Sequence, residues 1–375
     1  MTVADQTVLF AGGGTGGHLF PALAVAEVLA EQADAPALHF ACSDRAIDAR
    51  LLGGAGAAYT PLGVRPWPRR PWNWPSFLVA LRRARAESAG LIRAERVGLV
   101  VALGGFVSGP VVSAARRSGR RVPSLLINLD AVPGRANRLA ARLCDRVCSV
   151  HVAAGLPAGT EIVAMPLRRS VLSGGDQGAD RAALGLDAAV PVLLVTGASQ
   201  GARSINRMMI DLASQPSFQS AARSWQILHL AGEGEGADVA AAYRAAGLRH
   251  RVMDFCDEMG RAWGAADLAI SRAGAGSVAE VAANAVPTIF FPYPHHRDQH
   301  QKLNAAALVE AGGAELAEDL VDSAANVQRW GEPLANLLGD ADRRGKMHHA
   351  LKNLPRTRDG AEQVAKLIMK MWRDR

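Results

Sequence analysis

Ala11-Gly12-Gly13-Gly14-Thr15-Gly16-Gly17-His18 is the stretch of sequence that decides the fold. It follows an apolar run at residues 7–11 that is typical of a buried strand, and it precedes a helical pattern with Pro21 near its first turn. Glycines at such a junction let the backbone approach a bound group closely, and the N-terminus of the helix attracts an anion. The order of strand, glycine-rich turn and helix predicts a Rossmann-like α/β domain.

Strand and helix patterns alternate outward from this turn through both halves of the chain. In the first half we expect strands at residues 7–11, 38–42, 99–103, 124–129 and 146–150. In the second half we expect them at residues 192–196, 226–230, 252–255, 268–271 and 288–291. Strands that alternate with helices predict a parallel sheet covered on both faces, once in each half. The expected domains are residues 1–165 and 166–345, followed by C-terminal helices in 346–375, for which packing back on the N-terminal domain is one option.

Length and composition fit two α/β domains. The 375 residues are too many for one ordinary core, and 49% of them are hydrophobic. No run of 18 uncharged apolar residues occurs, so we expect no transmembrane helix, and residues 1–10 lack the pattern of a signal peptide. Four cysteines are too few for a disulfide framework, which favours a reducing cytoplasm.

The positive charge of the chain lies in its first half. Residues 1–165 contain 18 Lys+Arg and 11 Asp+Glu, which gives +7, whereas residues 166–375 contain 24 of each, which gives zero. Within the first half, residues 66–83 place Trp67, Trp72 and Trp74 among aliphatic side chains and arginines. Tryptophan and arginine together favour a membrane interface with anionic lipid over nucleic acid. The alternative is a proline-rich loop whose tryptophans only pack against the protein.

His18 is the unusual residue of the first glycine-rich turn. Gly12, Gly14 and Gly17 satisfy the dinucleotide pattern G-x-G-x-x-G, so a dinucleotide site is an alternative. That pattern has no role for an imidazole, yet His18 follows it directly. Because a helix N-terminus lowers the pKa of histidine, His18 suits a neutral general base. The other interpretation is a histidine that only caps the helix or packs.

Three more glycine-rich turns follow expected strands, at residues 104–110, 196–203 and 271–277. Two such turns in each half, all at the carboxyl ends of strands, predict a cleft between facing domains that binds phosphates and hydroxyl groups. Arg272 beside a helix N-terminus suits a pyrophosphate, and Glu280 suits the diol of a ribose. Taken one at a time, each turn could also be a glycine turn without a ligand.

At these turns the chain resembles the MurG family of peptidoglycan N-acetylglucosaminyltransferases. The family motifs T-G-G-H-x-x-P-A-L-A, G-G-[YF]-V-S-G-P and S-R-A-G-[AS] are matched at residues 15–24, 104–110 and 271–275. The motif G-S-Q-G-A-R-x-x-N is matched at residues 198–206 except that Ala198 replaces its first glycine. His300-Gln301 with Asn304-Ala305 resembles the family's sugar-contacting segment H-Q-x-x-N-A. The order and spacing of these motifs extend the resemblance from about residue 7 to 315.

The resemblance implies the α/β fold called GT-B, with two Rossmann-like domains whose parallel sheets face an interdomain cleft. It implies an inverting transfer of N-acetylglucosamine from UDP-N-acetylglucosamine to lipid I, which is undecaprenyl-pyrophosphoryl-N-acetylmuramoyl-pentapeptide, to form lipid II. It also implies a peripheral enzyme at the cytoplasmic face of the cell membrane, with no cofactor and no metal. His295, His296 and His300 could in principle bind a metal, but a junction beside the sugar site is the preferred interpretation.

The resemblance also assigns the site residues, each by its match to a family motif. The donor-binding residues would be Thr15, Gly16, Gly17, Arg168, Ser199, Phe255, Cys256, Arg272, Glu280 and Gln301. By these matches, the uracil would be contacted by Phe255 and Cys256, the phosphates by Ser199 and Arg272, the ribose by Glu280 and the sugar hydroxyls by Gln301. The acceptor-binding residues would be Gly105, Phe106, Ser108 and Asn137, with the acceptor pyrophosphate on the turns at residues 15–18 and 104–108. His18 would be the catalytic base that takes the proton of the acceptor hydroxyl.

The chain departs from the family pattern after the strand at residues 124–129. Where the family has H-E-Q-N-x-x-x-G-x-x-N, Gly134 and Asn137 are kept, but the first four positions are Ile127, Asn128, Leu129 and Asp130. A second departure is the hinge, where G-N-P-[VI]-R is replaced by Ala-Met-Pro-Leu-Arg at residues 164–168. We hypothesise that Asp130 is catalytic, in an acid–base or orienting role.

The first departure lies on the acceptor side, so alternatives stay open there. One is a related UDP-sugar transferase that acts on a different lipid or polyisoprenoid acceptor. Another is a UDP-sugar binder without catalysis. A nicotinamide enzyme built on the first turn is a third, and the donor-side turns argue against it.

Overall fold

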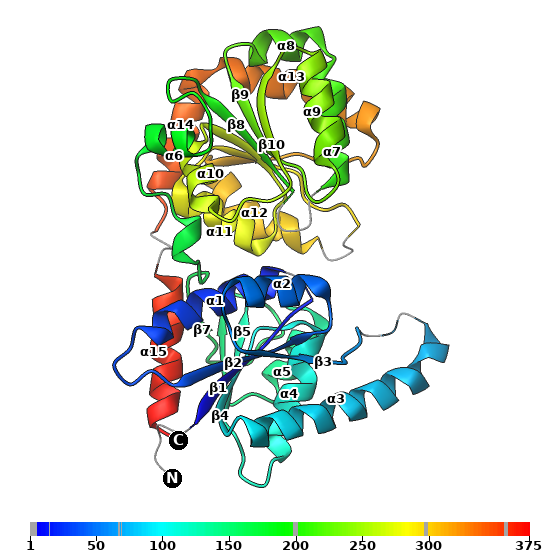
Figure 1. Ribbon diagram of the computed structural model, residues 1–375, viewed down its shortest axis with the longest axis vertical. Coiled ribbons are helices and arrows are strands. Elements are labelled where there is room, and N and C mark those ends of the chain that lie inside the picture. The colour runs from blue at the N-terminus through cyan, green and yellow to red at the C-terminus, as the bar shows by residue number, and fades with distance from the viewer. Residues whose placement is uncertain are drawn as a thin grey trace. The chain divides into compact units, whose positions relative to one another are not determined.

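The computed structural model describes residues 6–14, 16–66, 68, 70–197, 202–295, 299–355 and 359–375. The chain divides into two compact units, residues 1–168 with 358–375 (unit 1) and residues 169–357 (unit 2). Each unit is a parallel sheet with helices packed on it (Figure 1), as the sequence predicts. The divisions lie at 168 and 357 instead of the expected 165 and 345, since helix α14 (Ala341–Lys352) packs within unit 2.

The sheet of unit 1 has seven strands in the order β3-β2-β1-β4-β5-β6-β7. Their bounds are β1 Thr7–Ala11, β2 Ala37–Ser43, β3 Tyr59–Leu62, β4 Val97–Ala102, β5 Ser124–Asn128, β6 Arg146–Ser149 and β7 Glu161–Ile162. Every residue of β1, β4 and β5 is buried, as expected for central strands of a parallel sheet covered on both faces. The five expected strands of this half are confirmed, whereas the edge strands β3 and β7 were not expected.

Helices pack on both faces of this sheet. Their bounds are α1 Gly16–Ala30, α2 Ala46–Gly54, α3 Trp74–Ala94, α4 Gly105–Arg117, α5 Arg135–Ala141 and α15 Gly360–Arg373, with a 3₁₀ turn η2 at Pro71–Asn73. Helix α1 packs against α2 and α15, and α4 packs against α3 and α5. Leu9 and Ala11 share a cluster with α4, and because side chains alternate along a strand, Val8 and Phe10 point to the opposite face.

The sheet of unit 2 has six strands in the order β10-β9-β8-β11-β12-β13. Their bounds are β8 Val192–Thr196, β9 Gln226–Leu230, β10 Arg249–Met253, β11 Leu268–Ser271, β12 Thr288–Phe290 and β13 Ala314–Leu316. The strand expected at residues 252–255 lies three residues earlier, at β10. It is an edge strand with only β9 beside it. Its first residues, Arg249, His250 and Arg251, are polar because an edge strand is partly exposed. Strand β13, at the other edge, was not expected.

Two groups of helices cover the faces of the second sheet. Their bounds are α6 Gln177–Ala183, α7 Arg203–Ala213, α8 Pro216–Ala222, α9 Gly236–Ala245, α10 Met259–Ala265, α11 Ala275–Asn284, α12 His300–Glu310, α13 Ser323–Gly339 and α14, with a 3₁₀ turn η3 at Arg169–Val171. One core cluster contains residues of α7, α8, α9 and α13, and the other contains residues of α10, α11 and α12 with Leu184 and Leu186, which follow α6. Asp322 and Asp340 cap α13 and α14 by accepting bonds from Ala325 N and Arg343 N, at 2.8 Å each.

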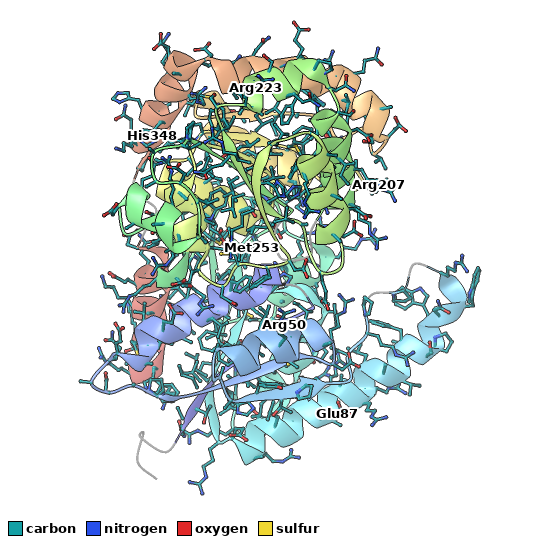
Figure 2. The ribbon with its side chains drawn as sticks, turned by 45° about the horizontal axis from the view of Figure 1, so that its top comes forward. Arg50, Glu87, Arg207, Arg223, Met253 and His348 are labelled. Atoms are coloured by element: carbon teal, nitrogen blue, oxygen red, sulfur yellow. The ribbon has the colours of Figure 1, made fainter. Side chains whose placement is uncertain are left out.

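The outer surfaces of the covering helices carry charged side chains. Figure 2 shows Arg207 at the outer surface of α7, and both Arg207 and Arg50 on α2 are exposed. Within the described ranges, none of the helices has the length and apolar character needed to cross a bilayer.

Candidate active site

The glycine-rich turn between β1 and α1 is held by Asp48, a residue that sequence reasoning missed. The Asp48 carboxylate is fully buried and accepts bonds from Gly14 N at 2.8 and 3.0 Å, and from Ser43 N and Oγ at 2.9 and 2.6 Å. A Cβ atom on Gly13 would lie 2.4 Å from Asp48 Oδ2. Gly14 has φ of 88°, which also favours glycine. The turn is therefore fixed by a buried carboxylate and closes only with glycines.

The second turn, between β4 and α4, is joined to the first by Ser108. Ser108 is buried, and its hydroxyl accepts a bond from Gly104 N at 3.0 Å and lies 2.8 Å from the Ala11 carbonyl oxygen. Ser108 was expected to bind the acceptor. Its hydroxyl instead links the ends of β1 and β4, so its direct contact with substrate stays a prediction.

A chain of amides supports the loop after β5, where the sequence departs from the family pattern. Asn137 Nδ2 donates to Asn128 Oδ1 at 3.1 Å, and Asn128 Nδ2 donates to the Asp130 carbonyl at 2.8 Å. Asn128 is fully buried and also donates to Ser149 Oγ at 3.0 Å. A Cβ on Gly104, whose φ is 96°, would lie 2.4 Å from Asn137 Oδ1. Asn137 and Asn128 thus position the Asp130 loop beside the second turn.

His18 lies in the first turn of α1 against the second glycine-rich turn. A Cβ on Gly105 would be 3.4 Å from His18 Cε1, so the ring lies directly against this turn, and the φ of 71° at position 105 favours glycine. The Nδ1 atom is buried and has no hydrogen-bond partner among the described residues. Burial lowers the pKa of His18, and the negative charges of Asp130 and Asp48 partly oppose this shift. The imidazole is therefore neutral at pH 7 and able to accept a proton.

Arg45 is a second residue that the sequence did not single out. Its Nη1 donates to the Gly14 carbonyl at 2.8 Å, and its Cζ lies 5.4 Å from the centre of the Phe106 ring. A Cβ on Gly14 would be 2.9 Å from Phe106 Cε1, so Phe106 lies directly against the first turn. Arg45 is exposed and places a positive charge beside both turns, where a pyrophosphate is expected.

In unit 2, Arg272 follows β11 and is paired inside the protein. Its Nη1 donates to Asp319 Oδ2 at 2.6 Å and to the Phe291 carbonyl at 2.9 Å, and its Nη2 donates to Ser204 Oγ at 2.8 Å. Burial would raise the pKa of Asp319, but bonds from Ser204 and Arg272 hold that pKa below its ordinary value. Arg272 thus connects β11 to α7 and to the segment after β12. Its role as a phosphate ligand stays a prediction.

Glu280 lies in α11 and faces Trp263 of α10. Trp263 Nε1 donates to Glu280 Oε2 at 2.8 Å. Burial raises the pKa of Glu280 to about 7, although the bond from Trp263 opposes that shift. Cys256 is buried in the same apolar cluster as Trp263. One carboxylate oxygen of Glu280 is therefore held by Trp263, and its contact with a ribose stays a prediction.

Gln301, in the first turn of α12, is brought close to the segment after β12. Its Oε1 accepts a bond from Tyr293 N at 2.8 Å, which leaves the amide Nε2 as a donor. Arg272 Cζ lies 5.8 Å from the centre of the Tyr293 ring. The structure therefore groups Arg272, Tyr293 and Gln301 at the carboxyl ends of β11 and β12.

The remaining expected site residues have different positions. Arg168 Nε donates to Glu27 Oε1 of α1 at 2.8 Å, so it lies in unit 1 and not among the donor residues of unit 2. Gly16 and Gly17 open α1, and Phe255 follows β10 and is half-buried. Thr15, Ser199, Trp67 and His296 lie outside the described residues. Within the described part of the chain no three His, Cys, Asp or Glu residues form a group that could hold a metal ion.

Comparison with known proteins places this geometry in context. The model of the glycosyltransferase family 28 N-terminal domain matches residues 8–149, and that of the family 28 C-terminal domain matches residues 192–363. A UDP-N-acetylglucosamine--N-acetylmuramyl-(pentapeptide) pyrophosphoryl-undecaprenol N-acetylglucosamine transferase of Clavibacter sepedonicus is 36% identical over 366 residues, covering 96% of this chain and 95% of that protein. The transferase of the same name from Frankia casuarinae is 36% identical over 379 residues, covering 98% and 96%.

Solved structures give the same result for the fold. The crystal structure of Acinetobacter baumannii MurG is similar with a TM-score of 0.72 and 26% identity, covering 97% of this chain and 99% of that one. The UDP-GlcNAc 2-epimerase of Neisseria meningitidis is similar with a TM-score of 0.63 at 13% identity, covering 99% and 100%, which concerns the fold alone. Two parallel α/β domains of the GT-B type, as the sequence predicts, are confirmed.

Proposed function

The chain belongs to glycosyltransferase family 28, and we propose that it transfers N-acetylglucosamine from UDP-N-acetylglucosamine to the N-acetylmuramyl unit of a pyrophosphoryl-undecaprenol acceptor. This is lipid I glycosylation, a step of peptidoglycan synthesis. The observation that carries the proposal is the neutral, half-buried His18 between two glycine-rich turns, in a chain 36% identical over 96% of its length to transferases named for this reaction.

The reaction needs a general base for the acceptor hydroxyl, stabilisation of the charge on UDP, and residues that bind the donor. The acceptor hydroxyl attacks the anomeric carbon, the bond from that carbon to the UDP oxygen breaks, and the electron pair leaves on UDP. The hydroxyl proton goes to His18, whose neutral imidazole can accept it. The charge that develops on UDP would be stabilised by the N-terminus of α11, which begins at Ala275 within the second glycine-rich turn of unit 2. We assign Glu280 to the ribose and Gln301 to the sugar.

Acceptor binding would use the two turns of unit 1. Backbone N–H groups at the start of α1 and α4, together with Arg45, provide donors and positive charge for the acceptor pyrophosphate. Gly105 and Phe106 begin α4 and would line the pyrophosphate site, while Ser108 and Asn137 support the turns through hydrogen bonds. Asp130 would orient His18 and stabilise its protonated form after the proton transfer.

We also propose that unit 1 docks peripherally on an anionic membrane surface through the start of α3. Trp72 is 70% exposed and Val79 is 65% exposed, and Arg70 Cζ lies 5.6 Å from the centre of the Trp72 ring. Exposed apolar side chains of this size beside arginines suit the headgroup level of a bilayer. All four cysteines are free thiols, which fits the reducing, cytoplasmic face of that membrane.

The test measures UDP release by the purified protein from UDP-N-acetylglucosamine, with and without a short-chain lipid I analogue. We expect release only with the analogue, and a loss of roughly 10²–10⁴-fold in His18→Ala because the general base is removed. His349→Ala, an exposed histidine of unit 2, is the matched control and should keep full activity. UDP binding with no UDP release in the presence of any acceptor would contradict the proposal. UDP release only with another polyisoprenoid acceptor would show that the proposed acceptor is wrong.

A further inference from the structure

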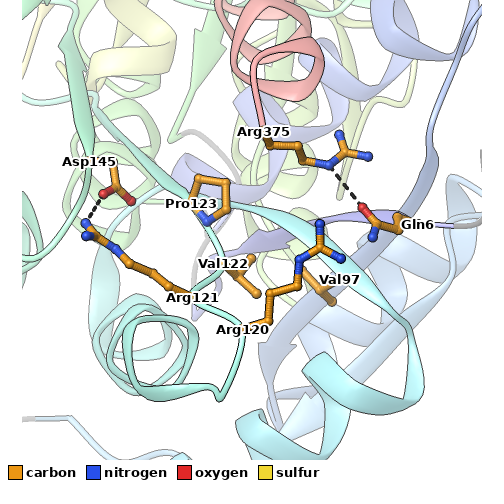
Figure 3. Close-up of a pocket in the computed structure, with 9 residues that line it drawn as sticks. Gln6, Val97, Arg120, Arg121, Val122, Pro123, Asp145 and Arg375 are labelled. Carbon is orange, nitrogen blue, oxygen red and sulfur yellow. Dashed lines mark hydrogen bonds and ion pairs between the residues drawn. The ribbon is translucent and has the colours of Figure 1, made fainter. Parts of the chain in front are cut away.

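A pocket lies at the end of the unit 1 sheet opposite to the glycine-rich turns. It has a volume of about 280 Å³ and is lined by residues at or just before the starts of β1, β4, β5 and β6 and by Arg375, which follows α15 (Figure 3). Strand β4 begins in this pocket at Val97 and ends at Ala102, just before Gly104 of the second turn. A strand of this length spans about 20 Å, so the pocket is separate from the proposed reaction site.

The charge of this pocket is strongly positive. Arg120, Arg121 and Arg375 line it with Asp145 as the acidic residue, which gives a net side-chain charge of +2. Asp145 is committed to Arg121, with which it forms an ion pair, and to Ser124 N, from which it accepts a bond at 2.8 Å. Figure 3 shows Arg120 and Arg375 extending toward the same space beside Gln6, whereas Arg121 turns toward Asp145. Neither Arg120 nor Arg375 has an acidic partner among the described residues.

One donor of Arg375 has no hydrogen-bond acceptor among the described residues, and the guanidinium lies over the face of the Trp372 ring. Its Nε donates to Gln6 Oε1 at 3.0 Å and its Nη1 to the Trp372 carbonyl at 2.7 Å. Its Nη2 is buried and has no hydrogen-bond partner among the described residues. Burial lowers the pKa of Arg375 to about 10, and the nearby charge of Arg120 adds to the shift. A buried N–H without an acceptor is costly, and an anion in the pocket would relieve both the missing bond and the repulsion.

Gly98 makes this arrangement possible. A Cβ at position 98 would lie 2.6 Å from Gln6 Oε1 and 3.0 Å from Arg375 Nε. Glycine in a central strand is otherwise unfavourable because it has no side chain to pack. Gly98 therefore leaves the space in which Gln6 holds the Arg375 guanidinium over the start of β4.

We propose that Arg120 and Arg375 bind a phosphate group in this pocket. Two guanidinium groups without carboxylate partners match the negative charge of a phosphate, whose oxygens accept hydrogen bonds from guanidinium N–H groups. The amide Nε2 of Gln6 is a further donor, because its Oε1 already accepts from Arg375. A bound phosphate would bridge α15 to the loop before β5, so it would stabilise the docking of α15 on unit 1 and take no part in the transfer reaction.

The first experiment measures the melting temperature of the full-length protein in inorganic phosphate and in chloride at equal ionic strength. We expect phosphate to raise it by at least about 2 °C, because a ligand that binds the folded state stabilises it. The active-site turns can also bind phosphate, so the comparison between variants decides. Arg120→Gln, Arg375→Gln and Gly98→Ala should reduce the shift, whereas Arg93→Gln, an exposed arginine at the end of α3, should keep it.

A second experiment separates free phosphate from a lipid headgroup, since both carry the same chemistry. Flotation with phosphatidylglycerol and with phosphatidylcholine vesicles is compared for the same proteins. Loss of flotation on phosphatidylglycerol in Arg120→Gln and Arg375→Gln, but not in Arg93→Gln, would assign a headgroup. Unchanged flotation with a reduced phosphate shift would assign free phosphate. If neither measurement distinguishes the pocket variants from Arg93→Gln, the proposal is overturned.

Discussion

His18 owes its proposed chemistry to its surroundings. Burial lowers its pKa below the ordinary 6.5, and the charge of Asp130 is the largest opposing effect. A histidine with a lowered pKa stays neutral at pH 7, and it stops acting as a base only when it is protonated at lower pH. We therefore expect the acidic limb of kcat/KM against pH to lie below 6.5. In Asp130→Asn the opposing charge is removed, the pKa of His18 falls further, and this limb moves to lower pH.

The control for this measurement is Asp130→Glu, which keeps the charge and should keep the limb close to that of the wild type. A limb in Asp130→Asn that stays in place or moves to higher pH would show that Asp130 does not act on His18. Unchanged turnover in the same variant would remove Asp130 from an acid–base role as well.

The sequence allows predictions for single residues that belong to a motif, but it does not reveal residues that act through long-range contacts. His18 and Gly105 were predicted from their turns, and the structure brings them together. Asp48 and Arg45 were missed because they follow β2, in a stretch without a recognisable pattern, and act on Gly14 across 34 and 31 residues. Neither motif nor spacing could show that the polar atoms of Arg272 are satisfied by Asp319 and Ser204, because those partners come from other elements.

The two halves of helix α3 differ in how much of their surface is buried. It has 21 residues, but its buried residues are Ala84, Ser88, Leu91 and Ile92, all in the second half. The first half leaves Trp74, Leu78 and Val79 exposed, next to Trp72 of the preceding turn. A helix end with exposed apolar side chains has little to pack on within its own unit, and Figure 1 shows that end of α3 extending away from the unit 1 sheet.

We expect the combined variant Trp72→Ala, Trp74→Ala and Leu78→Ala to lose most of its flotation with anionic vesicles. It should still glycosylate a water-soluble acceptor analogue, because these side chains are far from the glycine-rich turns along the chain. The matched control, Leu139→Ala with Val152→Ala and Ile162→Ala, removes exposed apolar side chains from elsewhere in unit 1 and should float like the wild type. Equal flotation of both combined variants and the wild type would mean that α3 is not the docking element.

Prediction succeeded for the central strands and was weaker at the edges, where β3, β7 and β13 were not expected and β10 was displaced. Strands β1, β4 and β8 are buried at every position, so their apolar runs are visible in the sequence. Strand β3 contains a proline at its edge position, and β7 has only two residues, both exposed. Such strands are formed by hydrogen bonds to a neighbour that is already in place, and their own composition does not reveal them.

Unit 1 is formed by two separate segments of the chain, because residues 358–375 return to it after unit 2. Helix α15 packs against α1 and buries Val364, Ile368 and Trp372. Its amphipathic pattern shows which face is buried, but an apolar face fits many partners. The docking of α15 was therefore left open by the sequence and is given by the structure.

We expect Ile368→Ala to destabilise unit 1 by about 2–5 kcal/mol, because Ile368 is fully buried and its truncation leaves a cavity. Hydrogen exchange measured by mass spectrometry should then show faster exchange in β1 and β4, with β8 and β11 unchanged, since each unit has its own core. Leu337→Ala in α13 is the reciprocal control, and it should speed exchange in β8 and β11 only. If either variant accelerates exchange in both sheets to the same extent, the chain unfolds as one cooperative body, and α15 stabilises more than the unit on which it packs.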